Sequence, residues 1–509
     1  MPSQSRFKGR LRKLLGYFRV RRRLWHSKAP RVPTVLPDSG SSISNAAVSQ
    51  SNIGQAQDPI DKLPYDILAI IFQLLSAQDP HSDSYDGPLP PTSLASCSVV
   101  SRAWRQFTGP FLFRHIFISP PYSGPPNQAF QDFLMFSEAR PDLMKHCRCM
   151  SISFADDFNF AAFLSQVVVS LTSLQHLTLE RVPIRPLDEL FRPDVASLEL
   201  DTLELACVYD PTTAKDAAGG AASDTASDVL AIALRTLPLS RVRCLNFRGS
   251  DYDYYDRLTP PGIADGASLQ RETPLVTIDK IVLDGDYCTT TVFELLEQVI
   301  QPGSLLALTA KCRRRQDLVG MAAFLRRGAG VNLKELELKL TTFMEAEQRA
   351  SMRDDLYVGP WSTFGDVVSA CPMLEMLHIG ILPYAIDEFR DGKAPFVRQQ
   401  YRLFASIADT LPSGFRTFKL SLHNRWDSPH ICRLSRELWD LSALDALSDE
   451  WRFARFERVV VLMPEWPDFG FLTAMDTAEE GAEECLPRLH SAKKIQYDWE
   501  EDKRKMLQH

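Results

Sequence analysis

The sequence predicts an α/β chain in which three short N-terminal helices precede a solenoid of alternating short parallel strands and helices. Three observations predict this fold. An apolar stripe at helical spacing runs through residues 63–75. Beyond residue 140 the pattern apolar-x-x-apolar-x-apolar keeps returning. Most copies follow an amphipathic helical stretch, and regular alternation of helices with short strands is typical of a parallel sheet lined by helices.

Length and composition indicate a globular chain in a reducing compartment. At 509 residues the chain has room for several domains or one long repeat array. Its ten cysteines are scattered without a C-x-x-C pair, and no asparagine begins an N-x-S/T sequon. No apolar run approaches the roughly 18 residues of a membrane span. We therefore expect a cytoplasmic and/or nuclear protein without a membrane span.

Charge is distributed very unevenly along the chain. Residues 1–37 hold eleven Lys or Arg and no Asp or Glu. The rest of the chain holds 46 basic and 64 acidic residues, a net charge of −18. An acidic body repels nucleic acid, so no nucleic-acid partner is expected.

The first 57 residues are expected to form a disordered basic arm and linker. Residues 29–57 are rich in Pro, Ser, Ala and Asn and poor in large apolar residues. The basic arm is compatible with a nuclear import signal, contact with an anionic membrane, an organelle-targeting segment or no dedicated role.

Residues 58–118 carry three pieces in a fixed order. Pro64 stands near the first turn of a predicted helix, where its missing N–H costs nothing. Thr92 is a plausible N-cap for a second short helix. A third segment begins near Ser101 and holds Trp104, and residues 116–118 alternate like a strand.

Taken together, these pieces resemble an F-box, here followed by degenerate leucine-rich repeat-like units as in F-box proteins of the fungal type. Two features depart from the family pattern: Asp66 replaces the usual Glu, and the stretch between the first two helices is longer than usual. The resemblance implies docking on a Skp-type adaptor and, through it, on a cullin-RING ubiquitin ligase. It assigns the adaptor contacts to ten residues: Leu63, Pro64, Ile67, Leu68, Ile71, Phe72, Leu94, Val99, Val100 and Trp104.

Residues 140–485 are interpreted as the repeat domain and residues 486–509 as a charged tail. The clearest copies of the apolar pattern begin at Leu174, Leu200, Ile278, Leu333, Leu374, Phe415 and Phe456, and weaker copies begin at Cys147, Val242 and Leu305. Several intervals fall within the roughly 20–29 residues of a leucine-rich repeat, and longer ones imply insertions. The Asn or Cys that usually follows the strand is largely missing, so the repeats are degenerate and a plainer α/β domain stays an alternative.

The sequence predicts a binding protein without catalysis. It contains no motif that points to catalytic residues, a cofactor or a metal site, and each histidine is expected to be a surface or packing residue. An unknown protein substrate is expected on the loops between repeats, with candidates at 213–228, 251–256 and 341–361. The basic run 311–315 is compatible with attraction of phosphate or an acidic partner, or with a solvated loop face. Two alternatives remain: a scaffold that holds partners without ubiquitin transfer, and an enzyme with an unfamiliar site.

Overall fold

The computed structural model describes sixteen stretches of the chain. They are residues 108–118, 128–153, 171–180, 182, 197–206, 234, 237–248, 275–283, 288, 290–312, 315–339, 361–381, 403–422, 440–448, 453–463 and 479–499. The chain divides into a unit of residues 1–63 and a unit of residues 64–509, and every described residue belongs to the second unit.

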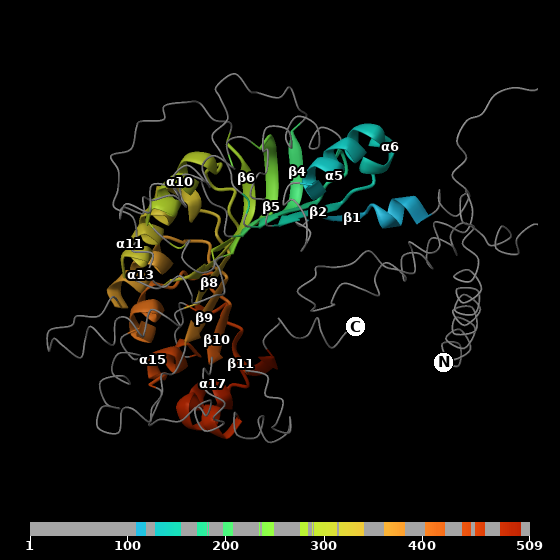
Figure 1. The fold of residues 1–509 in the computed structure, drawn as a ribbon. Helices are drawn as coiled ribbons and strands as arrows, with labels where there is room; N and C mark the ends of the chain where they lie inside the picture. The colour runs from blue at the N-terminus through green and yellow to red at the C-terminus, as the bar shows by residue number, and fades with distance from the viewer. Residues whose placement is uncertain are drawn as a thin grey trace, which may run out of the picture. The chain divides into compact units, whose positions relative to one another are not determined.

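Twelve parallel strands form one sheet in sequence order (Figure 1). The strands are β1 (His115–Ile118), β2 (Cys149–Ser153), β3 (His176–Glu180), β4 (Leu198–Ala206), β5 (Leu239–Arg248), β6 (Thr277–Leu283), β7 (Ala307–Lys311), β8 (Glu335–Lys339), β9 (Met376–Ile381), β10 (Thr417–Leu422), β11 (Arg458–Met463) and β12 (Ile495–Trp499). Each strand is therefore hydrogen-bonded to its neighbour along the chain, which is the topology of a solenoid.

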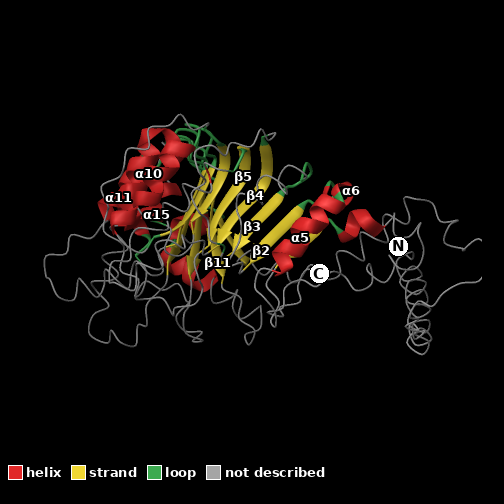
Figure 2. Ribbon diagram, turned by 45° about the horizontal axis from the view of Figure 1, so that its top comes forward, coloured by secondary structure: helices red, strands yellow, loops and turns green. Residues whose placement is uncertain are grey.

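Helices connect many of these strands. They are α5 (Gln128–Ala139), α6 (Pro141–Met144), α10 (Thr290–Val299), α11 (Arg315–Phe324) with the π-helical turn η7 (Leu325–Ala329), α13 (Trp361–Ser369), residues 403–410, α15 (Ser442–Asp445) with the 3-10 turn η10 (Ala446–Ser448), and α17 (Pro487–Ser491). Figure 2 shows α10 and α11 side by side on one face of the sheet, and α11 also contacts α13. The predicted fold class is confirmed.

The apolar-x-x-apolar-x-apolar pattern fixes which face of each strand enters the core. Its first, fourth and sixth residues are buried, as Leu333, Leu336 and Leu338 are at 0% exposure. Residues at the third, fifth and seventh positions lie on the opposite face because side chains alternate along a strand. We call this second side the open face. All ten predicted copies of the pattern coincide with strands β2 to β11.

Backbone carbonyls hold the beginnings of successive strands together. The carbonyl of the second pattern residue accepts two N–H groups from the next unit. The Lys334 oxygen accepts from Glu375 N at 2.8 Å and Met376 N at 2.9 Å, and the Glu375 oxygen accepts from the next unit's two amides, each at 3.0 Å. The carbonyls of Arg114, Arg148, Gln175, Leu306 and Arg416 do the same. This arrangement satisfies backbone donors at the strand beginnings with main-chain acceptors alone.

The sheet extends beyond the repeat domain predicted from the sequence. At one end β1, within the segment assigned to the F-box, pairs in register with β2. At the other end α17 and β12 lie within residues 486–509, which were predicted to be a charged tail, and β12 pairs with β11. Before β11 the described residues 440–448 contain the short α15 and η10.

A large-to-small change in the shared core tests this packing. Leu336→Ala removes a fully buried side chain and should lower the free energy of unfolding by about 2–5 kcal/mol. Leu306→Ala is a matched control, since Leu306 is 42% exposed, and it should change the free energy by no more than about 0.5 kcal/mol. Denaturant unfolding measures both, and equal losses would contradict the assignment of core and surface positions.

Candidate functional site

The ten predicted adaptor-contact residues, Leu63 to Trp104, lie outside the described residues, and so do the loop candidates 213–228 and 251–256 and all but Trp361 of 341–361. The structure does describe the junction between the predicted F-box and the sheet. Here the ring of Phe113 stacks on that of Phe136 in α5, with centroids 5.3 Å apart and an interplanar angle of 18°. Two residues later β1 begins, and it pairs with β2. The end of the predicted F-box segment is therefore packed into the first repeat.

The open face carries a chain of polar side chains across four neighbouring strands. Strand register places Thr309, Glu337 and His378 side by side on β7, β8 and β9. Thr309 donates a hydrogen bond of 3.0 Å to Glu337 Oε2, and His378 Nδ1 lies 3.3 Å from Glu337 Oε1. On the other side of the ring, His378 Nε2 lies 2.7 Å from Ser421 Oγ on β10. We call these four residues the Glu337 cluster.

Its surroundings hold the Glu337 carboxyl in its charged form. Burial by itself would raise the pKa of Glu337, but hydrogen bonds from His378 and Thr309 and the charges of His378 and Lys339 outweigh burial. The result is a pKa of about 2. The Glu337 side chain is 27% exposed and that of His378 is 15% exposed, so the cluster is held in place while part of it still reaches the surface.

The sequence Ser421, His378, Glu337 matches the order of groups in a nucleophilic triad, but its exposure does not suit that chemistry. A nucleophile must meet its substrate, and Ser421 is 0% exposed. The hydrogen bonds are those of an interstrand network that fixes side-chain positions on the open face. Sequence reasoning missed this cluster, because its members lie 28 to 43 residues apart and meet only through strand register.

A second polar group occupies the open face of the preceding strands. Ser153 on β2 donates to Glu180 on β3 at 3.3 Å. Burial raises the pKa of Glu204 on β4, and nearby Glu180 also raises it, while Arg248 on β5 and a hydrogen bond from Thr178 act in the opposite direction. Carboxylates therefore mark the open face at β3 and β4.

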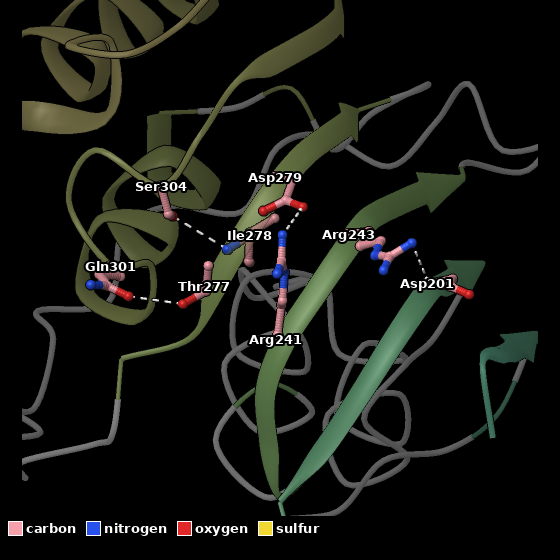
Figure 3. Close-up of polar contacts among 8 residues, drawn as sticks. All are labelled: Asp201, Arg241, Arg243, Thr277, Ile278, Asp279, Gln301 and Ser304. Atoms are coloured by element: carbon pink, nitrogen blue, oxygen red, sulfur yellow. Dashed lines mark hydrogen bonds and ion pairs between the residues drawn. The ribbon is translucent and has the colours of Figure 1, made fainter. Parts of the chain in front are cut away.

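Charged side chains at the second position of the apolar pattern form ion pairs between neighbouring units, where the strands begin (Figure 3). Arg243 lies 3.2 Å from Asp201, and Arg241, two residues earlier on β5, lies 2.7 Å from Asp279. Further along the sheet, Glu375 contacts Lys334 at 3.3 Å and Arg416 at 3.8 Å. At least one partner of each pair is well exposed to solvent, so this edge supports the register of the repeats rather than forming a site.

The same edge holds side-chain hydrogen bonds between a strand and the loop that follows its helix. Thr277 donates to Gln301 Oε1 at 2.8 Å, and Ser304 Oγ accepts from the backbone N–H of Ile278 at 3.3 Å (Figure 3). These contacts belong to the framework.

Over the residues that the structure describes, no three His, Cys, Asp or Glu side chains are grouped as metal ligands, and no helix has the length and apolarity to cross a membrane. The buried thiols of Cys288 and Cys312 lie 3.5 Å apart.

Comparison with known proteins identifies one part of the chain. Residues 60–119 match the F-box-like family. No curated protein matches the chain. Among solved structures, the leucine-rich repeat-containing protein LegL7 from Legionella pneumophila is 12% identical, with 74% of this chain and 100% of that one covered and a TM-score of 0.33.

The chain thus joins an F-box-like segment to a leucine-rich repeat-like sheet of parallel strands and helices. This combination defines a protein-interaction adaptor. The F-box-like match agrees with the resemblance found in the sequence and runs through β1.

The charge of Glu337 should make stability depend on pH. The pKa is about 2 in the folded chain against a reference of 4.5, so ionised Glu337 stabilises the fold above about pH 4.5, and this contribution fades as the pH falls towards 2. Glu337→Gln should therefore lower the free energy of unfolding at pH 7 by an amount on the order of 3 kcal/mol, and by much less at pH 3.

Denaturant unfolding at both pH values measures the difference between the original chain and the variant. Glu335→Gln on the same strand is the control, because Glu335 is exposed. A loss that is the same at pH 7 and pH 3 would contradict a charge-dependent role for Glu337.

Proposed function

We propose that this protein is the substrate-recognition subunit of a Skp/cullin/F-box-type ubiquitin ligase. It docks on the Skp-type adaptor through the F-box-like segment and binds a protein substrate with the repeat domain. The observation that carries the proposal is the F-box-like match at residues 60–119, which includes the first strand of the repeat sheet. This arrangement would hold the adaptor end and the binding surface on one continuous framework.

Adaptor docking falls to the ten residues assigned from the sequence: Leu63, Pro64, Ile67, Leu68, Ile71, Phe72, Leu94, Val99, Val100 and Trp104. Apolar residues on helices too short to bury them internally gain free energy by docking on a partner. Trp104 could act by folding the segment rather than by direct contact.

The repeat domain would supply position rather than chemistry. Holding a substrate beside the ligase raises the effective concentration of its lysines near the ubiquitin-carrying subunit. No catalytic residue and no cofactor are assigned to this chain, and the proposed location is the cytoplasm and/or nucleus.

Affinity purification from native extract tests the recruitment proposal. The intact chain should recover the adaptor, a cullin and one or more further proteins. A chain lacking residues 58–107 should lose the adaptor and the cullin and keep the others. The deletion ends before Thr108, because Thr108 is buried and β1 pairs with β2.

Recovery of the adaptor without a cullin would favour the non-degradative scaffold, in which the same repeat surface holds partners without ubiquitin transfer. An adaptor that still binds the deleted chain would contradict the proposal.

A single anchor in the first helix should also matter. Leu68→Ala should weaken adaptor binding about thirtyfold, or about 2 kcal/mol, if Leu68 is a central contact. Titration calorimetry of the full chain with purified adaptor measures the change, and an unaltered unfolding transition excludes misfolding. An unchanged affinity would contradict the role of Leu68.

A further inference from the structure

We infer that the open face from β5 to β10 binds an acidic segment of the partner protein, one whose charges are the carboxylates of Asp and Glu. This inference rests on the proposed function, because it names the chemistry that the repeat domain would select. The supporting observation is the set of charged side chains that strand register brings together on one face of the sheet.

Cations outnumber carboxylates on this part of the open face. Among its described positions, five side chains are cationic and two are acidic; the cations are Arg248, Lys280, Lys311, Lys339 and Lys419, and the acids are Glu335 and Glu337. The chain beyond residue 37 carries a net charge of −18, so a local excess of cations stands out from the body around it.

The Glu337 carboxylate is engaged mainly by the other members of its own cluster. The Glu337 carboxylate already accepts from Thr309 at 3.0 Å and faces His378 at 3.3 Å, while Lys339 is farther away at 3.8 Å. Lys339 therefore keeps capacity for a second anion, and its side chain is 38% exposed.

Strand register also brings like charges together. Lys311 and Lys339 are direct partners on β7 and β8, and like charges opposite one another on neighbouring strands destabilise a sheet. Beyond Lys339 the same row continues with Gly380, which has no side chain, and with Ser421. Lys419 lies in the neighbouring row, where its partner on β9 is His378. A carboxylate bound here would relieve the repulsion and meet ammonium groups from two sides.

The spacing of the strands gives the size of the bound segment. From β5 to β10 the sheet spans about 24 Å, because neighbouring strands lie about 4.8 Å apart. An extended peptide covers this distance with about seven residues. At physiological ionic strength charges farther away than about 8 Å are screened, so local lysines rather than the acidic body determine whether such a segment binds.

Peptide binding to the full chain tests the inference. The probe is a fluorescein-labelled Asp/Glu-rich peptide, followed by fluorescence anisotropy, with a Lys-rich peptide and a phosphoserine peptide of the same length for comparison. The Asp/Glu peptide should bind and weaken as salt is raised. Lys339→Gln with Lys419→Gln should weaken binding at least tenfold.

The matched control is Lys145→Gln with Lys493→Gln, which removes two exposed charges off the open face. It should leave peptide affinity unchanged, and both double variants should keep the thermal unfolding midpoint. No binding, an equal loss in the control, or binding of the phosphoserine peptide alone would overturn the inference. Adaptor binding by the same preparations separates the two ideas: it survives if only the peptide inference fails, and it is absent if the proposed function fails.

Discussion

The fold depends on one backbone interaction that is repeated along the sheet. At the beginning of successive strands a carbonyl oxygen accepts two N–H groups from the next unit, as the Arg148 oxygen does from Gln175 and His176 at 2.8 Å each. Because the contact uses only main-chain atoms, it tolerates almost any side chain at that position. It explains how the beginnings of successive strands stay in register although their side chains differ. The core side chains then need only be apolar at three positions of each unit.

The apolar pattern uses one face of each strand for the core and leaves polar side chains on the open face. Leu377 and Ile379 of β9 are fully buried on the helix side, while His378 between them is placed by the same register on the other side. Some side chains on this face are buried as well, among them Thr309, Thr417 and Ser421, and the face also holds the charge of Glu337 with Lys339 beside it. The F-box-like match includes β1, which pairs with β2 of the repeat sheet. Adaptor binding by the F-box-like segment and partner binding by the open face would therefore both depend on the same sheet.

Much of the architecture was predictable because the constraint on it is periodic. The ten apolar patterns located β2 to β11, and α13 lies where an amphipathic stretch was predicted before Leu374. The last strand escaped prediction because the small residue Ala492 occupies the first pattern position, which leaves Ile495 and Tyr497 as the large apolar signals. The F-box-like segment was predictable from the order of three local motifs, since no long-range contact was needed to find it.

The polar sites of the open face could not be predicted in the same way. His378 and Ser421 are 43 residues apart and meet only because β9 and β10 pair in one register. A single histidine in a sequence gives no indication of such a partner. The charges at the strand beginnings were equally hidden, although alternation between acidic and basic residues at the second pattern position would have indicated them.

Hydrogen–deuterium exchange on the full chain, with and without the Skp-type adaptor, tests the central claim most directly. Slower exchange confined to residues 60–107, with strands β3 to β11 unchanged, is the predicted result. Protection that spares this segment, or that falls on the open face of the sheet, would contradict an adaptor role for the F-box-like segment.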